Sequence, residues 1–468
     1  METSVQNPSE NDRFRDHLSF ENDHGGRRWL YPRVENGPLL RRRTVVAVVL
    51  LAALFGGPFL SVDGHPLFLF NVIERRFIFF GVPFWPQDFH LVAIGLITFI
   101  LFISLFTVVY GRVWCGWACP QTIFMEMVFR KIEIWIEGDH NARKRLDAAP
   151  WTNSKITKKV SKHFLFLLIS FLISNTFLAY LIGKDELFAI MTDDVRNHLG
   201  GFASIVVFTG VFYLVFARLR EIVCITICPY GRLQGVLLDK SSVVVAYDHV
   251  RGEPRGKIRK GETLKTGDCI DCALCVQVCP TGIDIRNGTQ LECINCTACI
   301  DACDNVMAKV NRPKGLIRFD SLEGIEKKVP LRFTGRMKAY TAVLLALVGL
   351  LTYLLVSRSD LETTVLRAPG QLFQREAGSY VSNLYTIEFV NKTTRSLPVS
   401  FRVSYPGARI RLVQPVGQAA PDALTKGVFF ILIPEKNLRD SNTKLEVEVV
   451  SNGKVIDRIQ TSFLGPTH

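Results

Sequence analysis

The chain has 468 residues, enough for two or three domains, and 48% of them are hydrophobic. Its formal net charge is +13. The basic residues behind this excess border long apolar segments, so membrane topology accounts for the charge and a nucleic-acid-binding function is not needed to explain it.

The N-terminal segment, residues 1–43, is polar and of mixed charge, and we expect it to be loosely ordered. It lacks the short apolar core and the small-residue cleavage site of a removed signal peptide. Arg41, Arg42 and Arg43 stand directly before the first apolar stretch. The segment is therefore interpreted as a cytoplasmic N-terminal tail.

Five stretches are long and apolar enough to be transmembrane helices, because a ~30 Å hydrocarbon core requires about 20 residues. Asp and Glu are absent from their interiors, which separates them from the amphipathic helices of a soluble core. They are residues 44–61, 90–110, 163–182, 199–217 and 340–356. We predict a four-helix membrane domain over residues 44–239 and a fifth transmembrane helix within residues 336–357.

The distribution of Lys and Arg predicts the orientation of these spans. Two loops on one side carry few basic residues: Arg75 and Arg76 in the first, Lys184 and Arg196 in the second. The loop between the second and third spans is rich in them: Arg112, Arg130, Lys131, Arg143, Lys144, Arg145, Lys155, Lys158, Lys159 and Lys162. The positive-inside rule then places the N-terminus in the cytoplasm and the C-terminus outside.

Two C-x3-C-P motifs follow the second and fourth spans: Cys115 and Cys119 with Pro120, and Cys224 and Cys228 with Pro229. On a helix this spacing places both thiols on one face, and a proline after the second thiol marks a break in that helix. Each of the two spans opens on a His-Leu dipeptide, so the membrane half is interpreted as a parallel repeat. The repeat would bring four thiols together at the cytoplasmic end.

Soft thiolate ligands suit Cu(I) or an iron–sulfur cluster, and burial of small apolar residues is the alternative interpretation of these four cysteines. Met125 and Met127 follow Cys119 closely; either they add thioether ligands or they are ordinary packing residues. His90 and His198 open their spans at the opposite face, too far along the helix to share a site with the cysteines. Copper, a quinone and no ligand remain open for them.

The remaining eight cysteines lie in the segment 240–335, which we interpret as a ferredoxin-like domain with two [4Fe–4S] clusters. Both runs have the spacing C-x2-C-x2-C-x3-C, followed by Pro280 in the first and Asp304 in the second. In this pattern three close thiolates bind one cluster and the fourth reaches the other. The first cluster would be held by Cys269, Cys272, Cys275 and Cys303, and the second by Cys293, Cys296, Cys299 and Cys279. Zinc is the alternative metal for C-x2-C pairs.

After residue 358 the pattern changes to short runs with period-two alternation, which predicts a small antiparallel β-sandwich over residues 358–468. The predicted strands are residues 385–390, 399–405, 409–413, 428–433, 444–450 and 455–462, with a hairpin turn at 451–453. Apart from His468 the domain contains no Cys, Met or His. It is therefore expected to contact a partner protein or to act as a spacer, and not to bind copper.

Together these features resemble one family, and the run Cys115-Gly-Trp-Ala-Cys119-Pro120-Gln121 carries most of the resemblance. Paired C-x3-C-P motifs, two ferredoxin quartets, a fifth span and a terminal β domain are similar to the CcoG/FixG/RdxA family. The resemblance implies a multi-pass protein of the bacterial inner membrane, with a periplasmic immunoglobulin-like domain. It also implies an accessory function in assembly of cbb3-type cytochrome c oxidase, linked to reduction of Cu(II) to Cu(I). The membrane motif is shared with NapH- and NosR-like electron-transfer proteins.

The predicted fold is thus a five-helix transmembrane bundle with a cytoplasmic 2[4Fe–4S] ferredoxin-like domain and a periplasmic all-β domain. The leading hypothesis is a membrane-bound oxidoreductase that reduces copper at Cys115, Cys119, Cys224 and Cys228. Its expected partners are a cytoplasmic electron donor and the oxidase assembly machinery or copper chaperones. Two alternatives are a quinol-linked electron conduit and a scaffold whose clusters are structural.

Overall fold

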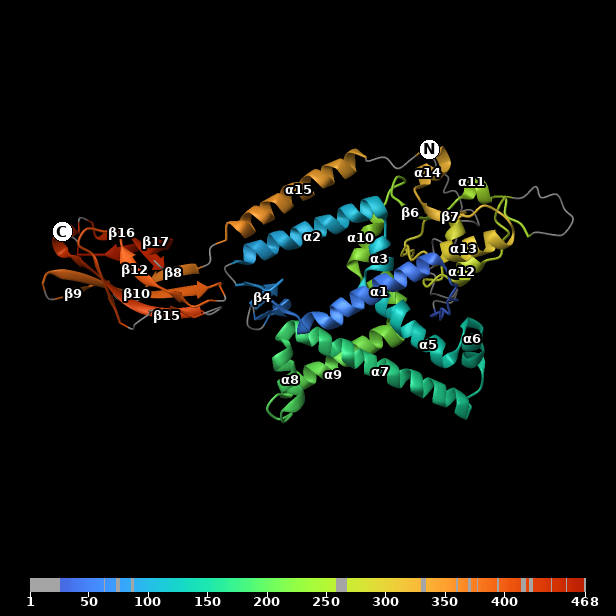
Figure 1. Ribbon diagram of the computed structural model, residues 1–468, viewed down its shortest axis with the longest axis horizontal. Coiled ribbons are helices and arrows are strands. Elements are labelled where there is room, and N and C mark those ends of the chain that lie inside the picture. The colour runs from blue at the N-terminus through green and yellow to red at the C-terminus, as the bar shows by residue number, and fades with distance from the viewer. Residues whose placement is uncertain are drawn as a thin grey trace, which may run out of the picture. The chain divides into compact units, whose positions relative to one another are not determined.

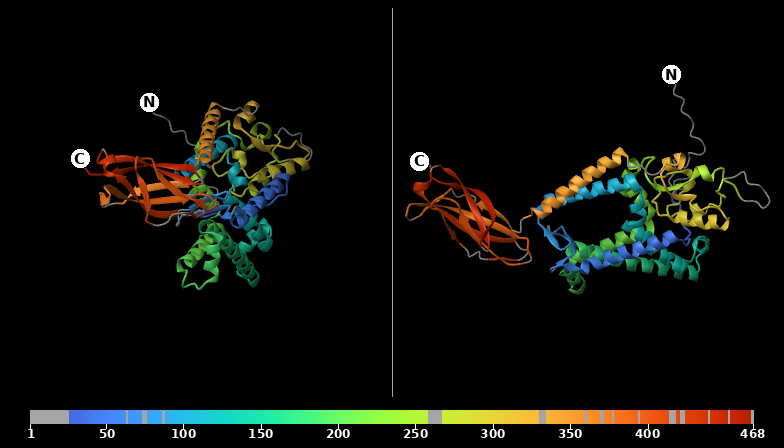
Figure 2. Two further views of the ribbon diagram at one scale, coloured as in Figure 1. Left: turned by 60° about the vertical axis from the view of Figure 1, so that its left-hand side comes forward. Right: turned by 45° about the horizontal axis from the view of Figure 1, so that its top comes forward.

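The computed structural model describes residues 26–466, apart from residues 63, 73–75, 86–87, 258–266, 330–333, 359–360, 369–371, 377, 394, 414–417, 421–423, 439 and 452 (Figures 1 and 2). The chain divides into two compact units. The first combines Met1–Phe59 with Ala93–Gly349, and the second combines Leu60–Val92 with Leu350–His468.

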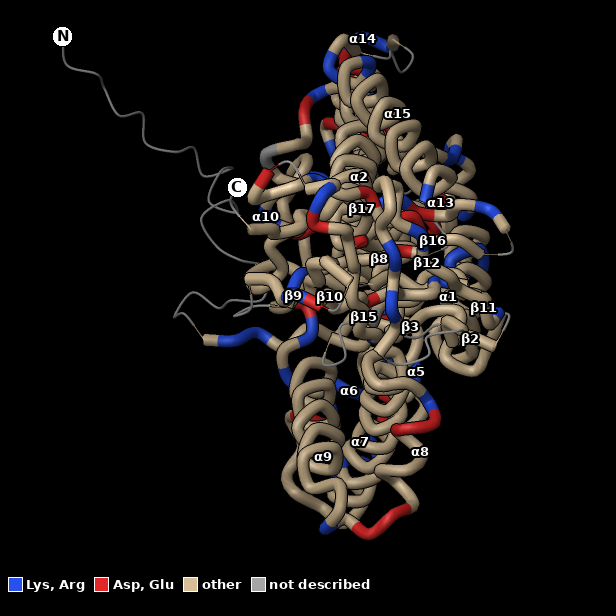
Figure 3. Tube along the Cα trace, turned by 90° about the vertical axis from the view of Figure 1, so that its left-hand side faces the viewer, with Lys and Arg blue, Asp and Glu red and all other residues tan. Residues whose placement is uncertain are grey.

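Four helices of the described residues are long and apolar enough to cross a membrane. They are α2 (Phe89–Tyr110), α7 (Asn153–Ile182), α9 (Leu199–Leu214) with its π-helical continuation η5 (Val215–Leu219), and α15 (Gly335–Val356). The tubes of α9 and α15 carry no charged residue over most of their length (Figure 3). These helices correspond to the second to fifth predicted spans, although α7 begins earlier, where Thr152 caps it by accepting from the Lys155 amide.

The first predicted span, residues 44–61, corresponds to α1 (Pro38–Gly56). This helix is not among the four, since its first turns contain three arginines and its apolar part begins only at Thr44. A fifth spanning helix stays a prediction.

Short helices connect the long helices of the first unit, most of them at the end where the cysteines lie. Around the first C-x3-C-P motif these are α3 (Val113–Trp117), α4 (Pro120–Ile123) and π-helical η4 (Phe124–Phe129). The others are α5 (Arg130–Glu137), α6 (His140–Ala148), α8 (Lys184–Thr192), π-helical η6 (Val223–Ile227) and α10 (Pro229–Leu237), with the single turn η2 (Gly57–Phe59) after α1.

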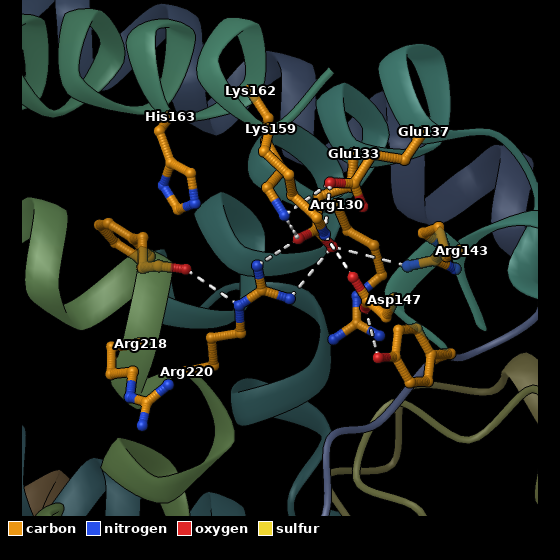
Figure 4. A network of polar contacts seen from close by, with 12 residues as sticks. Arg130, Glu133, Glu137, Arg143, Asp147, Lys159, Lys162, His163, Arg218 and Arg220 are labelled. Carbon is orange, nitrogen blue, oxygen red and sulfur yellow. Dashed lines mark hydrogen bonds and ion pairs between the residues drawn. The ribbon is translucent and has the colours of Figure 1, made fainter. Parts of the chain in front are cut away.

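A buried network of charged residues joins α5, α6, α7 and the end of η5 (Figure 4). The carboxylate oxygens of Glu133 lie 2.5 Å from a guanidinium nitrogen of Arg220, 3.5 Å from one of Arg143 and 3.6 Å from the Lys162 Nζ atom. Lys162 also lies 2.8 Å from Glu137. Although burial opposes ionisation of Glu133, the surrounding cations, Arg220 first, lower its pKa to about 2. Each of these buried charges thus has an oppositely charged neighbour, which offsets the free-energy cost of removing it from water.

The described part of the N-terminal segment is held in place, which corrects the expectation of loose order for residues 26–43. The Trp29 ring lies against two guanidinium groups, 4.5 Å from that of Arg27 and 4.6 Å from that of Arg220. Further along, the Arg33 amide donates to Gln277 and the Leu40 amide to Asp301. The polar, mixed-charge composition suggested loose order, but charged and aromatic side chains of this segment contact the buried charged network. Residues 1–25 lie outside the described residues.

The cysteine-rich segment of the first unit is compact and built on short elements. Strands β6 (Val244–Tyr247) and β7 (Ile317–Asp320) pair antiparallel. The helices are α11 (His249–Gly252), α12 (Leu274–Gln277), 3-10 turn η7 (Ile285–Asn287), α13 (Ala298–Lys309) and α14 (Leu322–Lys327). Their apolar core includes Ile283, Met307 and Ile317, and the cysteines pack against it.

The second unit contains a β-sandwich built from two facing sheets. One sheet has the order β13 (Arg409–Leu412), β15 (Leu424–Pro434), β10 (Tyr380–Asn391) and β8 (Leu361–Arg367), with β9 (Gln374–Glu376) also on β10. The other has β12 (Ser400–Val403), β16 (Asn442–Ser451) and β17 (Lys454–Leu464). Short pieces are β11 (Leu397–Pro398), β14 (Gln418–Ala419) and the 3-10 turn η8 (Glu435–Asn437).

All six predicted strands are present in this sandwich, and β8 and β9 were missed. In the core, Phe389, Phe429 and Phe463 are fully buried. The predicted turn at 451–453 joins β16 to β17, with Ser451 opposite Lys454; Asn452 lies outside the described residues.

The second unit also contains the strands β1 (Ser61–Val62), β2 (His65–Pro66), β3 (Phe68–Asn71), β4 (Arg76–Phe79) and β5 (Val82–Phe84). Buried Asp88, which follows them, lies 2.7 Å from both Arg358 and Lys392. Two cations on one carboxylate fasten this segment to the sandwich.

Candidate metal centres

Two enclosed cavities in the cysteine-rich segment are lined by thiols from both quartets. The first cavity is lined by Cys269, Cys272, Cys275 and Cys303. The second is lined by Cys279, Cys293, Cys296 and Cys299, and Cys275 lies in the wall between the two. Each cavity thus receives three closely spaced thiols from one quartet and the last thiol of the other.

The backbone of the two quartets has the same unusual conformation. In each quartet the residues on either side of the second cysteine have positive φ: Asp271 and Ala273 at 52°, Asn295 at 53° and Thr297 at 67°. This left-handed region is unfavourable for residues with a side chain, Ala and Thr more so than Asn and Asp. The reversal on both sides of the second cysteine allows three thiols within seven residues to face one cavity.

The donor set fits iron–sulfur clusters. Backbone amides of Thr281, Gly282 and Ile283 donate to the sulfur of Cys279, and amides also donate to Cys293 and Cys296. Such bonds stabilise cluster thiolates and tune their potential. Burial raises the pKa of Cys275, Cys293 and Cys303 to about 12, so metal must displace protons when it binds these thiols.

The same arrangement does not favour the zinc alternative. Throughout the part of the chain that the structure describes, no three His, Cys, Asp or Glu side chains converge to hold a single metal ion. A structural zinc ion needs four ligands at one point, whereas a cubane offers a different iron to each thiolate. Thiols spread around a cavity therefore suit a [4Fe–4S] cluster better than a single zinc ion.

Asp304, which replaces the proline of the first quartet, has an identifiable effect. Helix α13 continues through it to Lys309, whereas α12 ends at Gln277, before Cys279 and Pro280. Proline at position 304 would remove a helical amide and clash with the preceding turn. The Asp304 carboxylate instead accepts a 2.8 Å hydrogen bond from the Gly315 amide and fixes the loop before β7.

The four membrane-end cysteines are close enough for their charges to interact, but among the described residues no three of them converge on one metal position. Cys115 lies in α3 and Cys224 in η6, while Cys119 and Cys228 are the N-caps of α4 and α10. Burial raises the pKa of the Cys224 thiol, and so do the nearby Cys119, Cys115 and Cys228. Each proline marks a helix break, as predicted: α3 ends at Trp117 and η6 at Ile227, and each proline is the first residue of the next helix, where its missing amide has no cost. The prediction that both thiols of a pair share one helix was wrong, because the second cysteine of each pair is an extended N-cap.

The other candidate ligands of the membrane half lie elsewhere. Met125 and Met127 are 3% and 9% exposed and pack in apolar clusters, Met125 with Phe129 and Phe166. This favours the packing interpretation for both. His198 is the N-cap of α9, with its Nε2 atom 3.4 Å from Asp193, and His90 lies in the first turn of α2.

The first C-x3-C-P motif packs directly on the second quartet. A Cβ atom added to Gly116 would lie 2.3 Å from the Ile294 carbonyl oxygen and 3.0 Å from the Cys296 Cα atom. No residue other than glycine fits this contact without a backbone shift. Helix α3 therefore touches the loop that carries the thiols of the second cavity.

Two buried guanidinium groups flank this contact, and the sequence interpretation missed both. Arg112 donates to the carbonyls of Leu291 and Gly231, and its charge acts on the thiols of both Cys115 and Cys293. Arg43 donates to the Gly116 carbonyl at 2.8 Å, and its charge lowers the pKa of Cys296, which burial raises. In the sequence both arginines look like membrane-flanking charges, so no local signal distinguished them from the other basic residues at the helix ends.

Comparisons with known proteins agree with these features. The family described as "4Fe-4S dicluster domain" matches residues 219–322, and "4Fe-4S binding domain" matches residues 92–138. A family described as "IG-like fold at C-terminal of FixG" matches residues 351–466. The chain thus contains iron–sulfur domains and an immunoglobulin-like C-terminal domain, which confirms those two predictions.

Three relatives match most of the chain. "Nitrogen fixation protein FixG" of Rhizobium meliloti is 33% identical over 87% of this chain and 87% of its own length. "Protein RdxB" and "Protein RdxA" of Cereibacter sphaeroides are each 37% identical, over 78% and 77% of this chain and 79% of their own lengths. A crystal structure of a FixG-related protein from Vibrio parahaemolyticus covers 23% of this chain and 97% of its own, with 18% identity and a TM-score of 0.20.

Proposed function

The chain belongs to the FixG/RdxA family, and on that premise we propose that this iron–sulfur electron-transfer protein reduces Cu(II) to Cu(I) for assembly of a cbb3-type cytochrome c oxidase. The family resemblance supplies the oxidase and the metal. What the chain itself contributes is two adjoining groups of thiols and the contact that joins the segments carrying them.

We place the protein in the bacterial inner membrane, with its N-terminus and cysteine-rich segment in the cytoplasm and the β-sandwich in the periplasm. Basic residues at the cytoplasmic helix ends support this orientation. It keeps every cysteine in a reducing compartment, where thiols stay available to metals. The sandwich is then the part available to the oxidase assembly machinery or to copper chaperones.

In this proposal the two thiol-lined cavities hold two [4Fe–4S] clusters. Cys269, Cys272, Cys275 and Cys303 would bind one, and Cys293, Cys296, Cys299 and Cys279 the other. When bound, such clusters supply one-electron transfer. The protein's own contribution is to exclude water, to donate amides to the sulfurs and to hold the second quartet against α3.

The observation that carries the proposal is the close packing of Gly116 on the loop from Ile294 to Cys296. It supports a close approach of the second quartet to the thiols that we assign to copper, and the Arg112 charge acts on both Cys115 and Cys293. Backbone contact between the two cysteine-bearing segments is the arrangement that a short electron transfer needs. A scaffold with structural clusters would not require it.

Copper would be the substrate of Cys115, Cys119, Cys224 and Cys228, since thiolates prefer the soft Cu(I) product. Among the described residues no three of these thiols converge on one metal position, so the two pairs would have to close around copper as it binds. Each turnover adds one electron to Cu(II) and requires one from a cytoplasmic one-electron donor. No bond to the substrate is broken, so no general acid or base is needed. The raised pKa of Cys224, caused by burial and by the three nearby thiols, means that copper binding would release protons.

A third cluster at these four cysteines is the alternative, favoured by one observation. The iron–sulfur family that matches residues 92–138 includes Cys115 and Cys119 and none of the ferredoxin-type quartets. With a third cluster the protein would be an electron conduit of the NapH/NosR kind.

Anaerobic purification with iron analysis and EPR separates these functions. Copper reduction predicts about eight irons per chain, whereas a third cluster predicts about twelve. Cu(II) is then added to the dithionite-reduced protein. We expect Cu(I) to form, and the double substitution Cys115→Ser with Cys224→Ser to abolish this with the iron unchanged. Met125→Leu is the matched control and should behave as wild type. Twelve irons, or a double variant that still reduces copper, would exclude the proposal.

A further inference from the structure

A cavity of about 930 Å³ lies beside the second quartet and is not used by the proposed reaction. Its walls come from four places in the first unit: residues 32–37 before α1, the start of α1, η4 with α5, and the cysteine-rich segment. Pro280 and Ala298, which adjoin the thiols of the second cavity, form part of its wall. A cavity of this size can take a ligand of several hundred daltons.

The cavity has an excess of positive charge. Five basic side chains line it, and two of them are paired: Arg33 lies 2.6 Å from Glu35 and Arg130 lies 2.9 Å from Glu126. For the remaining three, Arg41, Arg43 and Lys131, no carboxylate lies within ion-pair distance among the described residues. Within the described residues, three positive charges in this cavity therefore lack a counter-charge.

Two of the lining guanidinium groups are also incompletely hydrogen-bonded. Arg43 is 5% exposed and Arg130 is 3% exposed. The Nη2 atom of Arg43 and the Nε and Nη1 atoms of Arg130 have no hydrogen-bond partner in the part of the chain that the structure describes. These nitrogens are covered by protein atoms and do not reach a ligand themselves, but the positive charge of their guanidinium groups beside the cavity favours an anion there.

An apolar surface continues from this cationic cavity along α1. Val45 lines the cavity and is 59% exposed, and Val48 and Val49, one turn further, are 59% and 60% exposed. Leu40, Met127 and Ile134 add apolar groups inside the cavity. A ligand that matches both parts has an anionic headgroup and hydrocarbon chains.

We propose that this cavity binds the phosphate headgroup of an anionic phospholipid, whose acyl chains lie along the exposed valines of α1. Basic pockets at the cytoplasmic ends of membrane helices select such lipids. A quinone has an uncharged headgroup and would leave the three cations uncompensated. Free phosphate would compensate them but has nothing to cover the valines. The bound headgroup would also cover Pro280 and Ala298, and so shield the second quartet from water.

Native mass spectrometry of the full-length protein in nanodiscs tests the proposal, with phosphatidylglycerol and phosphatidylcholine as the two probes. We expect phosphatidylglycerol to remain bound and phosphatidylcholine not to. Substituting Arg41→Gln together with Lys131→Gln should weaken phosphatidylglycerol binding about 30-fold, since two charges are removed. Both side chains are exposed, so folding should be unaffected; Lys131→Gln alone gives an intermediate loss if the pair fails to fold.

Arg145→Gln is the matched control, because Arg145 is an exposed residue of the same basic loop and does not line the cavity. It should retain phosphatidylglycerol. Equal retention of both lipids, or equal loss in the control and in the double variant, would overturn the proposal. Displacement of the lipid by millimolar inorganic phosphate would overturn it too, because it would show that the acyl chains contribute nothing.

Discussion

The two ferredoxin-type quartets and the two C-x3-C-P pairs both gather four thiols, but on backbones of different kinds. Each quartet has two residues of positive φ around its second cysteine, whereas residues 115–119 and 224–228 have none. An unfavourable backbone conformation is kept only where the surrounding structure, or a permanently bound ligand, holds it in place. Thiols on relaxed helix ends suit a metal that arrives and leaves. The quartets thus resemble a permanent cluster site and the pairs a substrate site.

The largest expected effect comes from removing a quartet thiol. Cys299→Ser deletes a thiol of the second cavity, so iron should fall from about eight to about four per chain, with loss of one cluster signal by EPR. Cys303→Ser should remove the other cluster although it lies only one helical turn away in α13. If both substitutions removed the same cluster, the division of thiols between the cavities would be wrong.

The next effect concerns the contact between the two regions. Gly116→Ala introduces a methyl group 2.3 Å from the Ile294 carbonyl, so α3 must move away from the second quartet. We expect iron and copper binding to be retained and copper reduction to slow at least tenfold, measured by single-turnover stopped flow. Ala118→Gly, in the same motif, is the control and should react at the wild-type rate. An unchanged rate of copper reduction for Gly116→Ala would show that electron transfer does not depend on this contact.

A pH dependence sharpens the comparison further. Burial and neighbouring thiols raise the pKa of Cys115 and Cys224 above the usual range, so both thiols are protonated near neutral pH. Copper must displace these protons, and its apparent affinity should therefore rise with pH, by about tenfold per unit for each thiol that ionises. Competition with a Cu(I) chelator between pH 6 and 8 measures the slope. A flat profile would mean that the copper ligands are not these thiols.

The smallest expected effect is on stability before iron is inserted. Ala273→Gly removes a side chain from a position at φ 52°, which should stabilise the iron-free protein by about 1 kcal/mol. The matched control is Ala302→Gly, in the middle of α13, which should destabilise it by about 1 kcal/mol. Urea unfolding of the two iron-free variants gives both values. Equal effects of the same sign would argue against stored strain in the first quartet.

Much of this architecture was readable from the sequence because it rests on periodic or fixed spacings. Long apolar runs and alternating strands gave four helices and six strands, and the cysteine spacing grouped the thiols. The N-terminal segment was misread, because partners such as Arg220 for Trp29 lie far away in sequence. The contact at Gly116 depends on two segments that meet only in the fold, and nothing local in the sequence reveals it. Strand β8 was missed because polar Glu362, Thr363 and Thr364 interrupt its apolar residues, and β9 has only three residues.

Reaction of the anaerobic, fully reduced protein with Cu(II) in a stopped-flow spectrometer tests the central claim most directly. Cluster absorbance and a Cu(I)-specific chelator are followed together. We predict that the clusters are oxidised as Cu(I) forms, one electron per copper, and that the Cys115→Ser, Cys224→Ser variant keeps its clusters reduced. Clusters that stay reduced in the wild-type protein while Cu(II) is present would contradict this account.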